Sequence, residues 1–342
     1  MYSFKNDYSE GVHPNILRTL IETNLIQQAG YGEDEFTNEA IHILKNKINK
    51  EDIDIHLLVG GTQTNLIAIS AFLRPYEAVI SANTGHIFVN ETGAIEATGH
   101  KVIAVNVNDG KLRVEDIKPV IEAHSSEHAV KPKLVYISNP TEIGTIYQKN
   151  ELEELSQFCR ENDLLFYMDG ARLGSALVAK ENDLTLLDFA TLLDSFYIGG
   201  TKHGALFGEA LIISSNLLKS NFRFNIKQKG GLLAKGRALG IQFSELFKND
   251  LYLEVSTHAN IMAEILHNGI KDLGFNFLIN SPTNQLFPIL PNKIIEKLEQ
   301  DYSFYRWTKI DENNSAIRLV TSWATLETEV TKFIKVLKEL KN

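Results

Sequence analysis

The segment KLVYISNPTEIGTIYQKNELEELSQFCRENDLLFYMDG, residues 133–170, contains the unit that decides the fold. Two short apolar runs, KLVYISN (133–139) and LLFYMDG (164–170), enclose an amphipathic stretch, KNELEELSQFCREN (149–162). Short runs rich in Val, Ile, Leu, Tyr and Phe are typical of buried strands, whereas apolar residues at helical spacing are typical of helices. The segment therefore predicts a strand, a helix and a second strand.

The same alternation continues on both sides of this segment. Further predicted strands are IDIHLLVG (53–60), EAVISAN (77–83), KVIAVNV (101–107), DSFYIGG (194–200) and EALIIS (209–214). Predicted helices are TQTNLIAISAFL (62–73), RVEDIKPVIEAH (113–124) and ARLGSALVAK (171–180). Strands that alternate with helices form a mostly parallel sheet covered by helices on both faces. The sequence therefore predicts an α/β fold with a mostly parallel seven-stranded sheet.

The pattern changes after about residue 215, where a second, smaller unit is expected. A glycine-punctuated stretch that leads into a helix (227–247) and a further helical stretch (249–274) precede short strand candidates and a final amphipathic helix. The strand candidates are FNFLINS (275–281), NQLFPILP (284–291), FYRWTKI (304–310) and AIRLVTSW (316–323), and the helix is 327–342. We expect a large α/β domain with an N-terminal arm over 1–245, and a small α+β domain over 246–342.

Composition narrows the class of protein. The chain has 342 residues, 44% hydrophobic and 23% charged, with a formal net charge of −9. An acidic chain of this kind is not expected to bind nucleic acid or a membrane surface. Cys159 is the single cysteine and cannot form an intrachain disulfide, so a reducing compartment fits. No apolar leader or membrane span is evident, no metal site is predicted, and the cytoplasm is the expected location.

Polar residues at the ends of the predicted strands are the candidates for a ligand site, because open α/β sheets bind ligands at the carboxyl ends of their strands. Gly60, Gly61, Thr62 and Gln63 follow the first strand and lead into a helix, whose free N–H groups suit a phosphate. His86 follows the next strand. Thr62 as an ordinary N-cap and His86 as a structural residue are the alternative interpretations.

Two further strands end in charged residues. Asp169 and Arg172 follow LLFYM, and Lys202 follows the strand at 194–200 in the glycine-rich turn GGTKHG (199–204). A carboxylate at the end of five apolar residues needs a partner, which can be Arg172 or a ligand. The turn SNPTE (138–142) carries Thr141 and Glu142, which can be ligand contacts or only turn residues.

Together, these residue types suit pyridoxal 5′-phosphate (PLP). A desolvated lysine has a lowered pKa and can bond covalently to the aldehyde of the cofactor. A carboxylate keeps the pyridine nitrogen protonated, so that the ring acts as an electron sink. A helix N-terminus holds the phosphate, an imidazole can stack on the ring, and arginines bind a substrate carboxylate. A dinucleotide-binding fold is disfavoured because the chain lacks the GxGxxG motif and its acidic partner residue.

The chain resembles the low-specificity L-threonine aldolases, in the β-eliminating-lyase branch of the fold-type I, transferase-like PLP enzymes. No one motif is sufficient, but the ordered set covers the chain nearly end to end. The matching stretches are YGEDEFTNEA (31–40), GGTQTNL (60–66), TGHIFVNETGAIEATGHKV (84–102), MDGARL (168–173), GGTKHGA (199–205), KGRALGIQF (235–243) and RLVTSW (318–323).

The resemblance implies a role for each matching residue. Lys202 is the lysine that bonds to PLP, Asp169 pairs with the pyridine nitrogen, and His86 stacks on the ring. Phosphate contacts are implied for Gly61, Thr62 and Gln63, with Thr201 close by. The substrate carboxylate is implied to contact Asn6, Arg172 and Arg318, although Asn6 and Asp7 match the family's Ser-Asp only in part. Tyr31 lies in a loop that reaches the neighbouring subunit's site in a homodimer or homotetramer.

One departure concerns the base. The family often has a second active-site histidine in an Asn-Thr-His-Asn-Gly turn, whereas this chain has SNPTEIGTIY (138–147). Glu142 can replace that histidine as a catalytic base, which changes the pH profile.

The expected activity is that of a carbon–carbon lyase, which cleaves L-threonine or L-allo-threonine to glycine and an aldehyde. PLP-dependent β-elimination and transamination remain alternatives, because the same electron sink serves all three reactions. A non-catalytic binding protein with this fold is a remote alternative.

Overall fold

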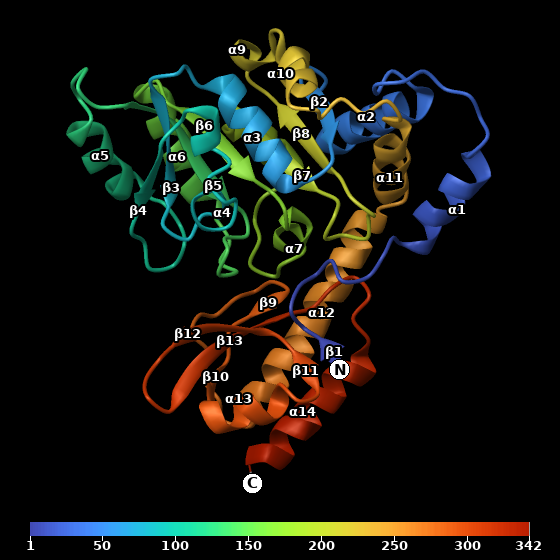
Figure 1. The fold of residues 1–342 in the computed structure, drawn as a ribbon, viewed down its shortest axis with the longest axis vertical. Helices are drawn as coiled ribbons and strands as arrows, with labels where there is room; N and C mark the ends of the chain where they lie inside the picture. The colour runs from blue at the N-terminus through green and yellow to red at the C-terminus, as the bar shows by residue number, and fades with distance from the viewer. Residues whose placement is uncertain (342) are drawn as a thin grey trace.

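The computed structural model describes residues 1–341, and its centre is a seven-stranded sheet in the order β2-β8-β7-β6-β5-β3-β4 (Figure 1). All seven strands were predicted from the sequence. Their bounds are β2 Asp54–Leu58, β3 Glu77–Ala82, β4 Val102–Val105, β5 Lys131–Ser138, β6 Leu165–Asp169, β7 Ser195–Gly199 and β8 Glu209–Ile213. Only the pairings of β8 with β2 and β7 are antiparallel, so the prediction of a mostly parallel sheet is confirmed.

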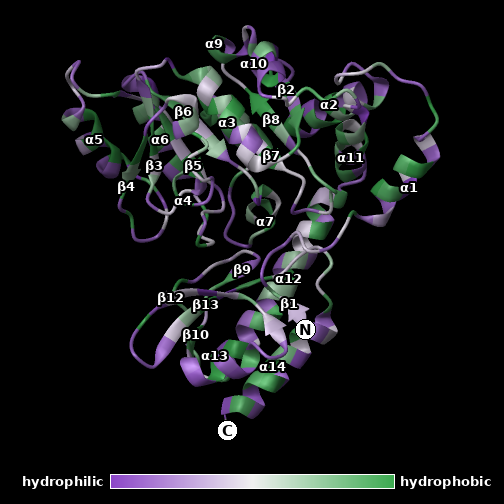
Figure 2. Cartoon of the chain, in the orientation of Figure 1, coloured by the Kyte–Doolittle hydropathy of each residue, from purple (hydrophilic) through white to green (hydrophobic). Residues whose placement is uncertain are grey.

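Helices cover both faces of this sheet because alternate residues of each strand point to opposite sides. In β6, Phe166 and Met168 belong to one apolar core, while Leu165 and Tyr167 belong to the other. The first core is completed by α2 (Glu35–Ile48), α5 (Val114–Ala123), α6 (Lys149–Glu161), α8 (Leu186–Leu192) and α11 (Arg237–Lys248), and the second by α3 (Gly61–Phe72) and α10 (Phe222–Gln228). Figure 2 shows the apolar colouring concentrated in the central strands, with polar residues on the outer helices.

The C-terminal part has a separate core. Its sheet contains β9 (Gln285–Leu286), β10 (Ile289–Pro291), β12 (Tyr305–Lys309) and β13 (Asn314–Val320), all antiparallel. Three helices pack with it: α12 (Leu251–Asp272), α13 (Asn292–Leu298) and α14 (Glu327–Lys341). The final helix, predicted over 327–342, ends at Lys341 within the described residues.

The predicted domain boundary between residues 245 and 246 stays a prediction. The chain passes between the two parts twice, once in the N-terminal arm and once along α12. Val255 in the first half of α12 lies in the large core, whereas Met262 further along the same helix lies in the small one. The N-terminal strand β1 (Tyr2–Ser3) pairs with β11 (Tyr302–Ser303), and Phe4 is buried in the small core. The N-terminal arm, which we had grouped with the large domain, therefore begins against the small one.

Two predicted elements differ from the structure. The segment 275–281 was expected to be a strand, but it forms only an isolated bridge between Phe277 and Pro288, since proline has no N–H to extend a ladder. The helix expected over 171–180 is the short α7 (Leu173–Leu177). Connecting helices α1 (Pro14–Thr23), α4 (His86–Val89) and α9 (Asn216–Lys219) complete the path, with the short 3₁₀ helix Glu96–Thr98.

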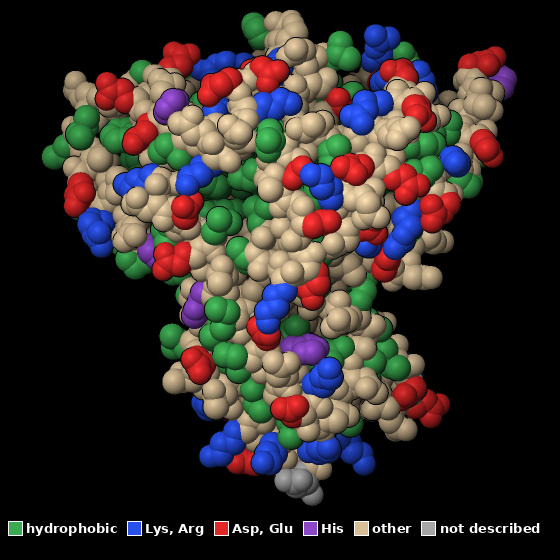
Figure 3. Space-filling model, turned by 180° about the vertical axis from the view of Figure 1, so that it is seen from behind, with side chains coloured by type: hydrophobic (Ala, Val, Ile, Leu, Met, Phe, Trp, Pro, Cys, Tyr) green, Lys and Arg blue, Asp and Glu red, His purple; other side chains and the backbone are tan. Residues whose placement is uncertain are grey.

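Acidic and basic side chains are interspersed over the face of the molecule shown in Figure 3, and the surface narrows between the two parts. None of the helices within residues 1–341 has the length and apolarity needed to span a membrane. Cys159 is buried in α6, and burial raises the pKa of its thiol to about 12. This thiol is therefore unreactive at neutral pH.

Helices α2 and α11 pack so closely that Gly240 has no room for a side chain. A Cβ atom at this position would lie 2.6 Å from the Cα of Thr37. We predict that Gly240→Ala lowers the free energy of unfolding by about 1–3 kcal/mol, because the backbone of α2 must move. Chemical denaturation measures the change. Gly11→Ala is the matched control, since nothing lies within 4 Å of its Cβ position; equal stability of the two variants would contradict the prediction.

Candidate active site

The carboxyl ends of the central strands open into a cavity of about 850 Å³ that also reaches β12 and β13 of the C-terminal part. Its wall contains most of the residues singled out in the sequence. The predicted residues that line it are Gly61, Thr62, His86, Glu142, Asp169, Arg172, Thr201, Lys202 and Arg318. The residues from Gly61 to Lys202 are thus gathered at one edge of the sheet, as the topology of parallel strands requires, and Arg318 joins them from β13 of the C-terminal part.

Lys202 lies on the turn between β7 and β8, where glycines allow two strand ends to touch. A Cβ atom on Gly199 would lie 2.8 Å from the Cα of Ala171, and one on Gly170 would collide with the carbonyl oxygen of Tyr197. Asp169 and Lys202, which follow the two neighbouring strands, are therefore held close together. Burial and the positive charge of Arg172 lower the pKa of Lys202, which favours the neutral, nucleophilic amine.

Asp169 is buried at the end of β6 and is surrounded by hydrogen-bond donors. Its Oδ2 accepts from the hydroxyl of Tyr136 (2.8 Å) and the amide of Asn65 (3.1 Å), and Oδ1 accepts from Ala171 N–H (3.0 Å). Burial disfavours the charge, but the positive charge of His86 and hydrogen bonds from Tyr197, Ala171 and Asn65 outweigh it, so the pKa of Asp169 lies below its ordinary value. Asp169 is therefore an ionised carboxylate, as a partner of a protonated pyridine nitrogen must be.

His86 begins α4, and its imidazole is held by a buried acid. Its Nδ1 lies 2.9 Å from Oε1 of Glu91, whose side chain is completely buried. Burial disfavours the imidazolium, but Glu91, Glu142 and Asp169 outweigh this and raise the pKa of His86 above its ordinary value. The carboxylate fixes the orientation of the ring and leaves Nε2 free for other contacts.

The N-terminus of α3 supplies the donors for an anion. Its N-cap Gly60 makes no side-chain capping bond, so the first N–H groups of the helix are available beside Gly61 and Thr62 in the cavity wall. Across the cavity, the Thr201 hydroxyl lies 2.8 Å from Oε1 of Glu209, and Thr201 Oγ1 accepts from Gly208 N–H (3.0 Å).

Arg172 is already paired with an acid of the N-terminal arm. Its Nε and Nη2 donate to the two carboxylate oxygens of Asp7 at 2.7 and 3.0 Å. Asp7 also accepts from Asn284 of the C-terminal part (2.9 Å). Burial disfavours the charge of Asp7, but Arg172 and Lys202 outweigh it, so its pKa lies well below the usual range. Only part of the Arg172 guanidinium remains for a substrate.

Arg318, on β13, is a cation without an acidic partner among the described residues. Its Nη2 makes one long hydrogen bond to the carbonyl of Lys5 (3.4 Å), and its Nε is buried without an acceptor. The guanidinium lies 4.9 Å and 5.4 Å from the ring centroids of Tyr305 and Trp307. A half-buried arginine with a buried, unused Nε donor is suited to bind a carboxylate from outside the chain.

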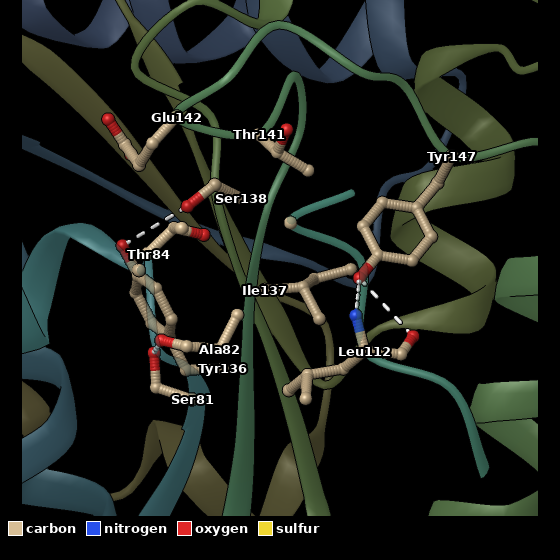
Figure 4. Close-up of a pocket in the computed structure, with 12 residues that line it drawn as sticks. Ser81, Ala82, Thr84, Leu112, Tyr136, Ile137, Ser138, Thr141, Glu142 and Tyr147 are labelled. Atoms are coloured by element: carbon tan, nitrogen blue, oxygen red, sulfur yellow. Dashed lines mark hydrogen bonds between the residues drawn. The ribbon is translucent and has the colours of Figure 1, made fainter. Parts of the chain in front are cut away.

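The turn in which the family histidine is missing presents Glu142 to the cavity. The neighbouring Thr141 is buried and bonds to the Thr145 hydroxyl (2.7 Å), so it is a structural residue of the turn. Figure 4 shows the two side chains pointing in different directions, with Glu142 on the side of Ser138 and Thr84. Ser138 in turn bonds to the hydroxyl of Tyr136 (3.4 Å). Glu142 is therefore the group of this turn that can contact a ligand.

Three residues implicated by the resemblance lie outside this cavity wall. The Gln63 side-chain oxygen accepts from Val59 N–H (3.3 Å), and Gln63 is absent from the cavity wall. Asn6 accepts from Tyr8 N–H (3.0 Å) and caps a turn of the arm, while its neighbour Asp7 reaches Arg172. The ring of Tyr31 lies 4.5 Å from Nζ of Lys227 at another surface, and its contact with a second subunit stays a prediction.

Several residues of the site were not predicted for their observed roles. Asn65 and Tyr136 bind Asp169, Glu91 holds His86, Asp7 holds Arg172, and Glu209 holds Thr201. The sequence did contain a signal for Glu209. It is an acid at the start of the apolar strand in GEALII (208–213), close to the matching motif GGTKHGA. The pairing of Asp7 with Arg172 has no local signature, because it joins segments 165 positions apart, whereas Glu91 lies only five residues after His86.

Comparison with known proteins agrees with this site. A model of the β-eliminating lyase family matches residues 14–290. The low-specificity L-threonine aldolase of Pseudomonas aeruginosa is 29% identical over 326 residues, which are 94% of this chain and 93% of that protein. A solved structure of a Leishmania major threonine aldolase is 51% identical, has a TM-score of 0.99 and covers 100% of both chains.

The fold is also that of a wider class. The histidinol-phosphate aminotransferase of Clostridium acetobutylicum has a TM-score of 0.76 at 16% identity, and covers 100% of this chain and 99% of that one. The fold and site therefore define a fold-type I PLP enzyme. Within this class, the chain belongs to the β-eliminating lyase family, and the predicted family and cofactor are confirmed.

The residues present fit PLP. Lys202 is a buried amine with a lowered pKa, Asp169 is an ionised acid, and the α3 N-terminus offers uncapped N–H groups within the same cavity. The amine is the nucleophile that an aldehyde requires, the carboxylate is the acceptor that a pyridinium requires, and the N–H groups are the donors that a phosphate requires.

We predict that Glu91→Gln lowers the pKa of His86 by about 1–3 pH units, because the variant removes a negative charge 2.9 Å from Nδ1. An NMR titration of the His86 ring protons measures this pKa. Glu96→Gln, at an exposed position, should leave it unchanged. An unaltered His86 titration in Glu91→Gln would show that Glu91 does not hold the imidazolium.

We predict that Asp7→Ala lowers the free energy of unfolding by about 3–5 kcal/mol at neutral pH, because Arg172 is left buried and unpaired. The folded-state pKa of Asp7 is depressed, so the stability it contributes is present above about pH 4 and is lost as the pH falls further. Denaturation at pH 7 and pH 3 should show a smaller difference between variant and wild type at pH 3. A constant difference would contradict this linkage.

Proposed function

We propose that the protein cleaves a β-hydroxy-α-amino acid, L-threonine or L-allo-threonine, to glycine and an aldehyde. The observation that carries this proposal is the single cavity in which Lys202, Asp169 and Arg318 meet two groups able to accept a proton, His86 and Glu142. The 51% identity to the Leishmania major threonine aldolase over the whole chain supports it.

The chain supplies the binding groups for the cofactor. Lys202 would be the covalent attachment point for PLP, Asp169 would keep the pyridine nitrogen protonated, and His86 would contact the ring. Gly61 and Thr62 at the α3 N-terminus would hold the phosphate, with Thr201 as a further donor. When bound, PLP withdraws electrons from the α-carbon of an amino acid, so that a bond to that carbon can break.

The two arginines orient the substrate. Arg318 has unused donors in the cavity, while Arg172 is fixed by Asp7 and offers its remaining N–H groups. A carboxylate bound between them directs the Cα–Cβ bond in a defined orientation, which selects that bond for cleavage. The rings of Tyr305 and Trp307 border the same region and exclude water from the carboxylate.

A base must take the proton of the β-hydroxyl group. Glu142 lines the cavity in the turn where the family often has histidine, and it is an acceptor when ionised. His86, whose orientation is fixed by Glu91, offers Nε2 as a second group for proton transfer. We assign the base role to Glu142, with His86 beside the ring.

We further propose a homodimer or homotetramer in the cytoplasm. Exposed apolar residues on and after α1, namely Leu17, Ile21, Leu25 and Ile26, support an assembly, since they have no cover within the described chain. Light scattering on the PLP-loaded protein tests this, and a monomer would overturn it.

We predict that the PLP-loaded protein releases acetaldehyde from L-threonine or L-allo-threonine, detected by an NADH-dependent aldehyde reductase. Lys202→Ala should lose the activity, and Glu142→Gln should lower kcat about 10²–10⁴-fold while PLP affinity stays unchanged. Glu122→Gln, exposed on α5, is the matched control. A 2-oxo acid in place of aldehyde and glycine would assign β-elimination instead, and no product at millimolar substrate would remove the aldolase assignment.

A further inference from the structure

A second buried carboxylate, Glu209, lines the active-site cavity and has no part in the function proposed above. It begins β8, where it pairs with Leu58 of β2 and Gly199 of β7, and only 4% of its surface is exposed. It belongs to the strand that directly follows the Lys202 turn.

Glu209 has fewer donors than the other acid of the cavity. Asp169 accepts from a phenol, an amide and a backbone N–H. Oε1 of Glu209 faces the Thr201 hydroxyl (2.8 Å), and Oε2 accepts from Gly200 N–H (3.2 Å), which it shares with the carbonyl of Gly208 (2.8 Å). A buried carboxylate with so little compensation favours its neutral, protonated form.

The hydrogen bonds of Thr201 differ between the two forms of Glu209. Thr201 Oγ1 already accepts from Gly208 N–H (3.0 Å). If Glu209 is ionised, the Thr201 proton must point to it, and no donor remains for a phosphate. If Glu209 is protonated, it donates to Thr201 Oγ1, and the Thr201 proton is free to point into the cavity.

The surrounding charges favour the second arrangement once a phosphate is bound. Burial raises the pKa of Glu209 to about 8, Thr201 and Lys202 oppose this, and Asp169 adds to it. A phosphate at the α3 N-terminus adds further negative charge to the same cavity. The ionisable groups that act on Glu209 or respond to it are Lys202 on the adjacent turn, Asp169 and Tyr167 on β6, Tyr197 on β7 and Tyr252 on α12.

We propose that Glu209 is a positioning residue that carries a proton when PLP is bound, and that it donates this proton to Thr201 so that the Thr201 hydroxyl can donate to the phosphate. The proton comes from solvent and stays on Glu209, and no bond of the cofactor is changed. The inference rests on the phosphate position in the proposed function. It links cofactor affinity to pH: affinity is complete below about pH 8 and falls above it, as Glu209 loses the proton in the free protein.

The test compares the pH dependence of PLP binding in wild type and Glu209→Gln, from pH 6.5 to 9.5. Protein freed of cofactor is titrated with PLP, and the visible absorbance of bound cofactor gives Kd. Glutamine donates a hydrogen bond but does not ionise, so the variant should match wild type at pH 6.5. Above pH 8, the wild-type Kd should rise by up to about tenfold per pH unit relative to the variant.

Glu154→Gln, exposed on α6, should follow the wild-type curve. If Kd for PLP changes with pH in the same way in wild type and Glu209→Gln, the inference is overturned. Much tighter binding by the variant at pH 6.5 would also overturn it, because it would indicate that Glu209 is ionised and repels the phosphate. If wild type binds no PLP at any pH, the proposed function itself fails.

Thr201 variants keep the inference testable if Glu209→Gln does not fold. Thr201→Ser retains the hydroxyl and should retain wild-type affinity at pH 7, whereas Thr201→Val should raise Kd about 3–10-fold through loss of one hydrogen bond. Equal affinities of the serine and valine variants would overturn the inference. The thermal stability of the cofactor-free variants separates a weakened turn from a lost phosphate contact.

Discussion

The structure depends most on burying the negative charge of Asp169. A carboxylate removed from water at the end of β6 costs several kcal/mol unless donors surround it. Those donors come from Asn65 on α3, Tyr136 on β5 and the turn that follows Asp169. Meeting this requirement fixes three segments of the sheet edge relative to one another. The same edge then holds the start of α3, where a phosphate is expected, and the Lys202 turn.

Hydrogen bonds of a buried carboxylate beside the cavity connect the two parts of the molecule. Asp7, on the N-terminal arm, binds Arg172 of the large part and Asn284 of the small one. Arg318 of the small part has no acid of its own among the described residues and faces the same space. The contacts between the two parts therefore include residues of the site proposed to bind the substrate carboxylate.

Comparison with other proteins shows which features belong to the fold in general and which select the reaction. An aminotransferase with a TM-score of 0.76 and 16% identity has the same fold, so the fold does not select a reaction. Selection depends on which substrate bond is oriented for cleavage and on which base is near it. In the function proposed for this chain, those features are Arg172, Arg318 and the turn that presents Glu142, while Glu209 and Thr201 are proposed to act on the side of the cofactor.

Local sequence determined much of this protein. Strand-length apolar runs predicted all seven central strands, and the residues after them, such as Lys202 and Asp169, were found because parallel strands end at one edge. The ordered motifs identified the family and its cofactor. The expected strand at 275–281 failed because its partner segment contains Pro288, which cannot be seen from the run itself.

Only the tertiary structure decided how the charges pair. Asp7 meets Arg172 across 165 positions of sequence, and His86 proved to be held by Glu91, next to which Asn65 also binds. The contacts of Asp7 with Arg172 and of Asn65 with Glu91 have no periodicity or motif, since they arise where separately formed elements pack. Burial then sets the ionisation of each group: Asp169 has donors and is charged, whereas Glu209 has few, and burial raises its pKa to about 8. Sequence specified which residues stand at the sheet edge, and packing determined their protonation and partners.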